Sequence, residues 1–128
     1  MLFIKSLSLM KGEIKMAYVT NQQIMQDILV DMTYACASWI QQVKTSIKYN
    51  DLLGKSVEDK WYNCLECGGK LIIIDNEDYD KHEVDYKQLS KAISIIRKKP
   101  CFKDDTNWDE IFVNNIIQTA IFGEVIFD

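Results

Sequence analysis

The most extended pattern of apolar and polar positions lies between about residue 21 and residue 48. Apolar side chains recur there every three to four residues, at Ile24, Ile28, Met32, Ala35, Trp39 and Val43. This spacing matches one face of an α-helix. Thr20 and Gln23 stand at its start with the spacing of a capping box. The sequence therefore predicts an amphipathic helix over residues 21–48, with Trp39 on its buried face.

Three further helices are expected, each with a capping-box spacing at its start. The pairs that mark these starts are Ser56 with Asp59, Asp85 with Gln88, and Asn107 with Glu110. Glycine and proline end helices, so we expect the three to end near Gly68, Pro100 and Gly123. On the last helix, the residues expected to face solvent are Asn114, Asn115, Gln118 and Thr119.

Three short apolar segments outside these helices predict β-strands. Residues 70–75, KLIIID, are a continuous β-branched run that is typical of a buried strand. Residues 82–86 follow after a polar turn, which predicts a hairpin, and residues 124–127 predict a third strand at the C-terminus. The sequence thus predicts one α+β domain of four helices packed on a small antiparallel sheet, in the order ααββααβ.

The N-terminal residues 1–15 admit two interpretations. Residues 11–16, KGEIKM, can be encoded as AAA GGA GAA ATA AAA ATG, which contains a bacterial ribosome-binding site at a suitable distance from a start codon. On this hypothesis residues 1–15 are a translated leader or a disordered segment, and the domain comprises residues 16–128. The alternative is an N-terminal strand with the sequence LFIKSLSL.

Composition and charge limit the classes of function. The 128 residues carry 15 basic and 19 acidic side chains, which gives a formal net charge of −4. Nucleic-acid binding needs a basic surface to neutralise phosphates, so we expect no direct nucleic-acid binding. No segment approaches the roughly 18 continuous apolar residues of a membrane span, and no secretory cleavage site is present. We expect a cytoplasmic protein with reduced thiols.

Cys64 and Cys67 raise the question of a metal site, because Cys-x-x-Cys followed by glycines is typical of half a zinc ribbon. A structural zinc ion needs four ligands, usually from two such pairs. Cys36 and Cys101 are single cysteines far away in the sequence. The pair also falls in the last turn of a predicted helix, where the glycines are explained as the helix stop. We therefore predict no metal and no cofactor.

Residues 75–85, DNEDYDKHEVD, hold six acidic side chains. These are Asp75, Glu77, Asp78, Asp80, Glu83 and Asp85. A calcium-binding loop would need a central glycine, but the glycine is missing and Tyr79 occupies a ligand position. Two interpretations remain. One is a solvated hairpin turn, and the other is an acidic surface that meets a basic groove on a partner.

The sequence contains no recognisable catalytic motif. His82 is the only histidine, and nucleophilic catalysis needs a base beside a thiol or hydroxyl. Acids in a surface loop do not form a general acid–base pair, and a glycine-rich phosphate-binding loop is absent. We therefore predict no catalytic residue and keep an enzyme as a third alternative.

The C-terminal sequence DEIFVNNIIQTAIFGEVIFD is similar to the ends of a family of small proteins from phages and mobile elements of low-GC bacteria. The matching residues are Asp109, Gln118, Ala120, Phe122, Gly123 and Glu124. Trp39, the glycine pair before KLIIID and the segment DYKQLSKAI also resemble that family, so the resemblance covers residues 16–128. The family has no agreed activity. The resemblance implies that the glycines are the shared feature and that the Cys-x-x-Cys is incidental.

These features together favour a non-catalytic accessory protein that binds and inhibits a host protein. A defence protein that handles nucleic acid is a natural target, which would make the chain an anti-defence, anti-CRISPR-like inhibitor. The acids of residues 75–85 would imitate phosphates in a basic groove, together with Trp108 at the start of the last helix. The alternative is a protein that sequesters a small signalling nucleotide, bound by aromatic residues and by Arg97, Lys98 and Lys99. A C-terminal strand at a sheet edge also predicts a homodimer.

Overall fold

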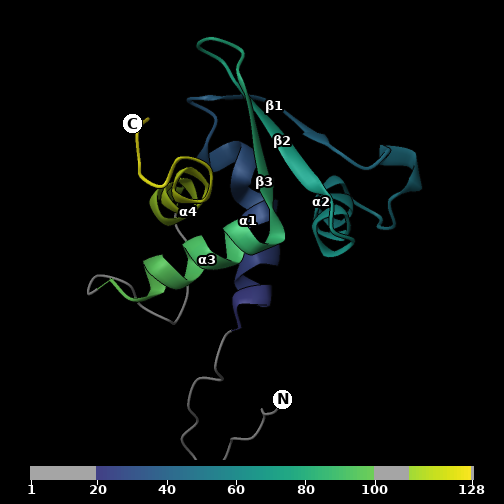
Figure 1. Ribbon diagram of the computed structural model, residues 1–128, viewed down its shortest axis with the longest axis horizontal. Coiled ribbons are helices and arrows are strands. Elements are labelled where there is room, and N and C mark those ends of the chain that lie inside the picture. The colour runs from purple at the N-terminus through teal and green to yellow at the C-terminus, as the bar shows by residue number, and fades with distance from the viewer. Residues whose placement is uncertain (1–19, 100–109, 128) are drawn as a thin grey trace, which may run out of the picture.

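The structure, a computed structural model, describes residues 20–99 and 110–127 (Figure 1). In chain order the elements are α1 (Asn21–Ala35), β1 (Ile40–Thr45), the 3-10 helix η1 (Tyr49–Asp51), α2 (Val57–Glu66), β2 (Lys70–Asp75), β3 (Lys81–Asp85), α3 (Tyr86–Arg97) and α4 (Glu110–Phe122). Within these two ranges, four α-helices and a three-stranded antiparallel sheet confirm the predicted α+β class. The predictions for residues 1–15, Cys101, Asn107 and Trp108 lie outside the described residues.

The first helix is shorter than predicted. It ends at Ala35, and residues 36–39 turn the chain into β1. Along β1, Val43 and Thr45 are half-buried while the residues between and beside them are exposed, which is the period of a strand. The expectation of a helix over residues 21–48 was wrong because the apolar positions after Trp39 fit both periods, and no glycine or proline marks the boundary.

The strand order in the sheet is β1-β2-β3, and both pairs are antiparallel. The predicted hairpin is present as β2 and β3. The third strand is β1, which lies between the first two helices in the sequence, and the expectation of a strand at residues 124–127 was wrong. In the observed register Val43 lies opposite Ile73, and Leu71 lies opposite Val84.

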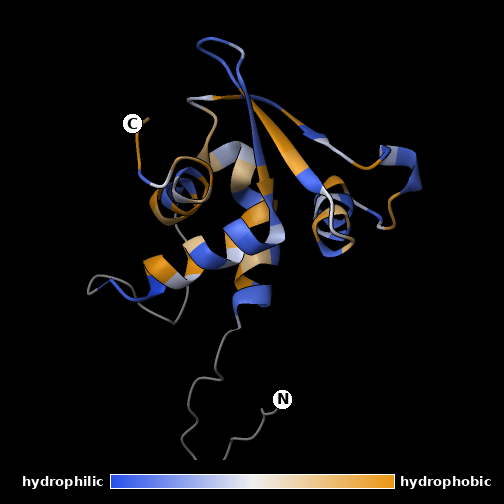
Figure 2. Cartoon of the chain, in the orientation of Figure 1, coloured by the Kyte–Doolittle hydropathy of each residue, from blue (hydrophilic) through white to orange (hydrophobic). Residues whose placement is uncertain are grey.

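All four α-helices and one face of the sheet contribute to a single hydrophobic core. Helix α1 occupies its centre and contacts α2, α3 and α4 (Figure 1). Five side chains of α1 are at most 1% exposed: Ile24, Met25, Ile28, Leu29 and Met32. Figure 2 shows that β2 is strongly hydrophobic and that the loop joining it to β3 is hydrophilic. The hairpin therefore runs from the core into solvent.

The starts of α1, α2 and α3 follow the predicted caps. Thr20 and Asp85 form complete capping boxes with Gln23 and Gln88. Ser56 accepts a hydrogen bond from the backbone N–H of Asp59, as predicted for the start of α2. The side chain therefore satisfies a backbone N–H that the first turn of each of these helices leaves without a partner.

The turn after α2 explains the glycine pair. Gly68 has φ +86°, in the left-handed region that favours glycine. The N–H of Gly68 donates to the carbonyl of Leu65 and that of Gly69 to the carbonyl of Cys64, at 3.1 and 2.8 Å. This pair of bonds is a Schellman motif. A Cβ atom on Gly69 would lie 2.7 Å from the Cys64 sulfur. The conformation of Gly68 and the close packing at Gly69 therefore explain why both positions are glycine.

The C-terminal segment, residues 124–127, is held by one side chain of α4. Gln118 is fully buried, although it was expected to face solvent. Its Oε1 accepts from the backbone N–H groups of Ile126 and Phe127, both at 2.7 Å, and its Nε2 donates to the carbonyl of Phe127 at 2.9 Å. The side-chain amide thus makes the backbone hydrogen bonds that a neighbouring strand would otherwise make. The homodimer stays a prediction, but it no longer follows from a strand at a sheet edge.

Candidate functional site

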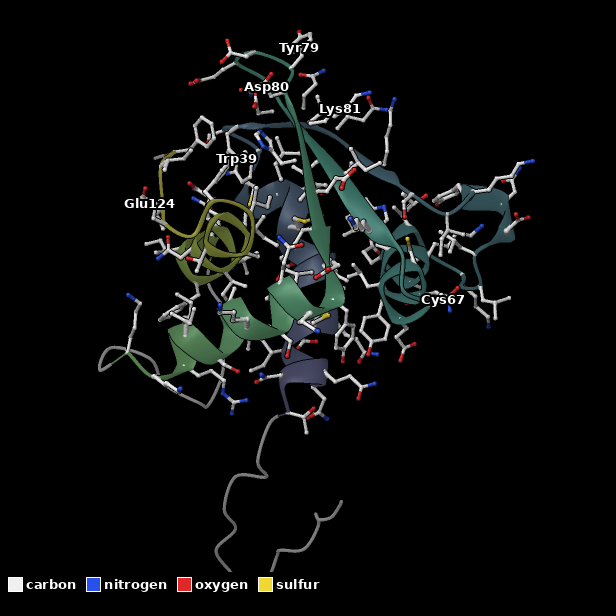
Figure 3. All side chains as sticks on the ribbon, in the orientation of Figure 1. Trp39, Cys67, Tyr79, Asp80, Lys81 and Glu124 are labelled. Atoms are coloured by element: carbon white, nitrogen blue, oxygen red, sulfur yellow. The ribbon has the colours of Figure 1, made fainter. Side chains whose placement is uncertain are left out.

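The connection between β2 and β3 forms a projecting acidic tip. We call residues 76–80 the hairpin tip. Glu77, Asp78 and Asp80 are exposed there, and Tyr79 is 65% exposed with φ +59°. Figure 3 shows Tyr79 and Asp80 at the far end of the hairpin, directed away from the helices. Three of the six acids predicted to bind a partner are therefore presented together with an aromatic side chain.

Asp75 lies beneath the hairpin tip and is not available to a partner. It is 4% exposed, and its Oδ1 accepts from the backbone N–H groups of Glu77 and Asp78 at 3.1 and 2.8 Å. Its Oδ2 lies 2.8 Å from Nε2 of His82. The bond from His82, followed by the backbone bond from Asp78, lowers the pKa of the Asp75 carboxyl. Asp75 therefore shapes the tip instead of binding at it.

Asn76 fixes the hairpin tip to the turn before β1. Its backbone N–H donates to the carbonyl of Trp39 at 2.8 Å, and its side-chain amide donates to the carbonyl of Ser38 at 3.1 Å. The first residue of the tip is thus held from one side by β2 and from the other by residues 38–39. These bonds, together with those of Asp75, favour one conformation of the tip.

The last two acids of the predicted set serve other purposes. Glu83 forms an exposed ion pair with Lys70 at 3.2 Å, a contact of the kind that contributes little to stability. Asp85 caps α3, where it accepts from the N–H of Gln88 at 2.8 Å. The acidic surface is consequently narrower than residues 75–85 and is limited to the hairpin tip.

The basic residues of the alternative nucleotide site lie at the end of α3. Arg97 is half-buried, and its Nη1 donates to Oδ1 of Asn21 at 3.0 Å. Lys98 and Lys99 are exposed beyond the last residue of α3. Trp108, the aromatic member of the predicted partner set, lies outside the described residues.

An aromatic cluster supports the base of the hairpin, and sequence reasoning missed it. Trp39 is stacked on Phe127 with ring centroids 5.1 Å apart, and Phe122 contacts both rings. His82 meets Phe122 edge to face, with centroids 4.9 Å apart. Trp39 Nε1 donates to Asn114 Oδ1 at 2.8 Å. The residues come from four separate segments, so no local pattern indicates that they meet.

The reactive side chains of this region are constrained by their surroundings. Asp75 bonds both to His82 and to two backbone N–H groups of the turn, so this pair is held beneath the hairpin tip. Burial raises the pKa of the Cys36 thiol to about 12, so this thiol stays protonated at neutral pH and is a poor nucleophile. Across residues 20–99 and 110–127, no group of three or more His, Cys, Asp or Glu side chains is arranged to hold a metal ion.

Comparison with family models, with curated proteins and with solved structures finds no match to this chain. In the part of the chain that the structure describes, no helix has both the length and the apolar character of a membrane span. The geometry of the hairpin tip is therefore the basis for the proposal that follows.

Proposed function

We propose that this protein is a non-catalytic binding protein whose hairpin tip enters a basic groove of a protein partner. One observation carries the proposal. The exposed side chains of Glu77, Asp78, Tyr79 and Asp80 stand on a backbone that Asp75 holds through two hydrogen bonds. The buried carboxylate orders the tip and so presents these four side chains together.

A preordered tip favours binding because the tip loses little conformational entropy when it binds the partner. Tyr79 supports this view. A non-glycine residue at positive φ is uncommon, and such residues persist where the surrounding structure imposes them, often at binding sites. Tyrosine is also enriched among the residues that dominate interface energies. Tyr79 would bury its ring against the partner while the flanking carboxylates meet its cations.

The partner's surface is expected to be basic, since the three exposed carboxylates give the tip its charge. Opposite charges accelerate association and select the partner, and both effects weaken as salt is added. Basic grooves in proteins commonly serve nucleic acid. Together with the resemblance to phage and mobile-element proteins, this supports a host protein that handles nucleic acid, inhibited in the cytoplasm of a bacterium.

The test compares two variants with the same change in charge. The tip variant carries Glu77→Gln, Asp78→Asn and Asp80→Asn. The control variant carries Asp31→Asn, Asp51→Asn and Glu124→Gln, three acids that are also exposed but lie elsewhere. The wild type and both variants are immobilised and incubated with lysate of a low-GC bacterium. The captured proteins are identified and purified, and their affinities for the three proteins are measured by titration.

We expect the wild type and the control variant to capture the same protein, and the tip variant to bind it at least about tenfold more weakly. A nucleic-acid duplex should displace the wild type from that protein. If the tip variant binds as well as the control variant, or if nucleic acid and this protein bind the partner together, the proposed function is wrong.

A further inference from the structure

Residues of α1, α2 and the loop before α2 line a second acidic surface. The labelled ribbons of α1 and α2 lie away from the end of the β2–β3 hairpin (Figure 1). The first turns of α1, one face of α2 and the loop at Leu53 and Gly54 enclose an open groove of about 490 Å³. This volume lies within the range of sites that bind small ligands or short peptide segments. We call it the α1–α2 groove.

The charge of the α1–α2 groove is entirely negative. Its carboxylates are Asp27, Glu58, Asp59 and Glu66. Among the described residues that line it, none is lysine or arginine. Asp59 accepts a long hydrogen bond from the backbone of Lys55. The side-chain carboxylates of Asp27, Glu58 and Glu66 make no hydrogen bond or ion pair with another side chain of the described ranges. A cationic ligand would relieve the repulsion between these carboxylates.

An independent observation at the same groove points to a ligand. Tyr62 lines it and is only 8% exposed, and its hydroxyl is a buried polar group without a hydrogen-bond partner of normal geometry in the described structure. Leaving such a group unpaired is costly. Burial raises the pKa of Tyr62, and Tyr86, Glu66 and Gln22 lie close enough to affect it as well; Glu66 and Gln22 also line the groove. A ligand in the groove could supply the missing partner.

The spread of the carboxylates indicates an extended organic cation. They do not converge as metal ligands do. The groove also contains the side-chain amides of Gln22, Gln26 and Asn63, which donate and accept hydrogen bonds as a peptide backbone does. A polyamine offers donors only. Val30 and Leu53, which are 58% and 75% exposed, add apolar surface at the same place.

We propose that the α1–α2 groove binds an extended segment of a protein partner that carries arginine or lysine side chains. The carboxylates would pair with the cationic groups, and the Tyr62 hydroxyl would accept a hydrogen bond from one of them. Burial, with a further contribution from Tyr86, raises the pKa of Tyr62, so the hydroxyl stays neutral. This inference is independent of the proposed function, because no residue of the hairpin tip takes part.

The test uses the full-length protein and a defined probe, a capped hexapeptide of alternating arginine and leucine. Its control is the same peptide with citrulline in place of arginine, which keeps the shape and removes the charge. Calorimetry measures affinity, and backbone amide NMR shifts locate the peptide. The groove variant is Glu58→Gln with Glu66→Gln. Its matched control, with the same change of charge, is Asp31→Asn with Asp51→Asn.

We expect the arginine peptide to bind with Kd below about 1 mM and to shift amides of α1 and α2, while the citrulline peptide does not bind. The groove variant should bind at least about tenfold more weakly than its matched control. Tyr62→Phe should bind about threefold to tenfold more weakly and melt no lower than the wild type. If Tyr62 had only a structural role, Tyr62→Phe would lower the melting temperature and leave the affinity for the peptide unchanged.

The proposal is overturned if the two peptides bind equally, if the shifted amides lie outside α1 and α2, or if spermine displaces the peptide at equal concentration. The hairpin-tip variant separates the two proposals. It should bind the arginine peptide as the wild type does. A weaker affinity of the hairpin-tip variant would mean that the peptide responds only to net charge, which would contradict a site in the groove. Failure of the lysate experiment leaves the groove result unaffected.

Discussion

Two irregular segments of this molecule are each organised by one buried polar side chain, and the two side chains differ in kind. Asp75 holds the hairpin tip, and Gln118 holds residues 124–127. A carboxylate only accepts, which suits a turn that presents two N–H groups. An amide accepts and donates, which suits an extended segment that presents N–H groups and a carbonyl. The difference has a thermodynamic consequence, because only the carboxylate titrates.

Trp39 lies where the two segments meet, so its removal should have the largest effect. Its ring stacks on Phe127, and its carbonyl accepts from Asn76. Truncation of a buried aromatic side chain costs about 3–5 kcal/mol, a large share of the stability of a small domain. We expect Trp39→Ala to lose about that much, measured by urea denaturation. Trp39→Phe is the control, since it keeps a ring on Phe127 and should lose less. If Trp39→Ala melts like the wild type, the cluster does not support either segment.

The C-terminal segment should depend on Gln118 more than on its own apolar residues, since Val125 and Ile126 are exposed. Gln118→Ala removes four side-chain hydrogen bonds from a fully buried position, three to the backbone of residues 126–127 and one to Asn114. We expect a loss of about 2–3 kcal/mol. Hydrogen exchange at the amides of Ile126 and Phe127 should lose its protection. Asn115→Ala on the same helix is the control, with a change within about 0.5 kcal/mol. Retained protection in Gln118→Ala would show that the packing of Phe127 alone holds the segment.

The hairpin tip should be the segment that responds to acid. The folded-state pKa of Asp75 is lowered, so its contribution is complete above the ordinary aspartate pKa of about 3.9. That contribution is lost as the pH falls through this value toward the lowered pKa. Asp75→Asn keeps an oxygen for the N–H groups of Glu77 and Asp78 but does not titrate. At pH 7 we expect a loss of about 1 kcal/mol.

The measurement for Asp75 is the stability of both proteins between pH 7 and pH 3. The difference in unfolding free energy between wild type and Asp75→Asn should shrink as the pH falls. The corresponding difference between wild type and Gln118→Ala should not change with pH. A difference that stays constant for Asp75→Asn as well would mean that its carboxyl has the same pKa in the folded and unfolded states.

The sequence predicts those parts of this fold that depend on neighbours in the chain. Capping residues such as Asp85 and the β-branched run of β2 act within a few residues, so the starts of α1, α2 and α3 and the hairpin follow from them. The end of α1 does not, because tertiary pairing of Val43 with Ile73 overrides a helical period that continues past Ala35.

The site is less predictable than the fold because the roles of polar residues depend on distant contacts. Charge alone makes Asp75 and Asp78 equivalent, yet one is buried beneath the turn and the other is exposed on it. Gln118 lies among polar neighbours on a helix, and only the return of the chain at Phe127 makes it a core residue. The unpartnered hydroxyl of Tyr62 has no counterpart in the sequence pattern, where it is one more apolar position of α2.

The turn after α2 contrasts with both segments, since glycine conformation and not a buried polar side chain holds it. Cys64 is buried with its sulfur 3.5 Å from the carbonyl of Lys70, while Cys67 is exposed at the helix end. We therefore expect Cys67→Ser to change stability by less than about 0.5 kcal/mol, and a chelator to leave the melting temperature unchanged. Gly69→Ala provides the contrast and should destabilise clearly, because its Cβ would lie 2.7 Å from the Cys64 sulfur. Elemental analysis showing about one zinc per chain, with unfolding on chelation, would mean that the cysteines and not the glycines determine this turn.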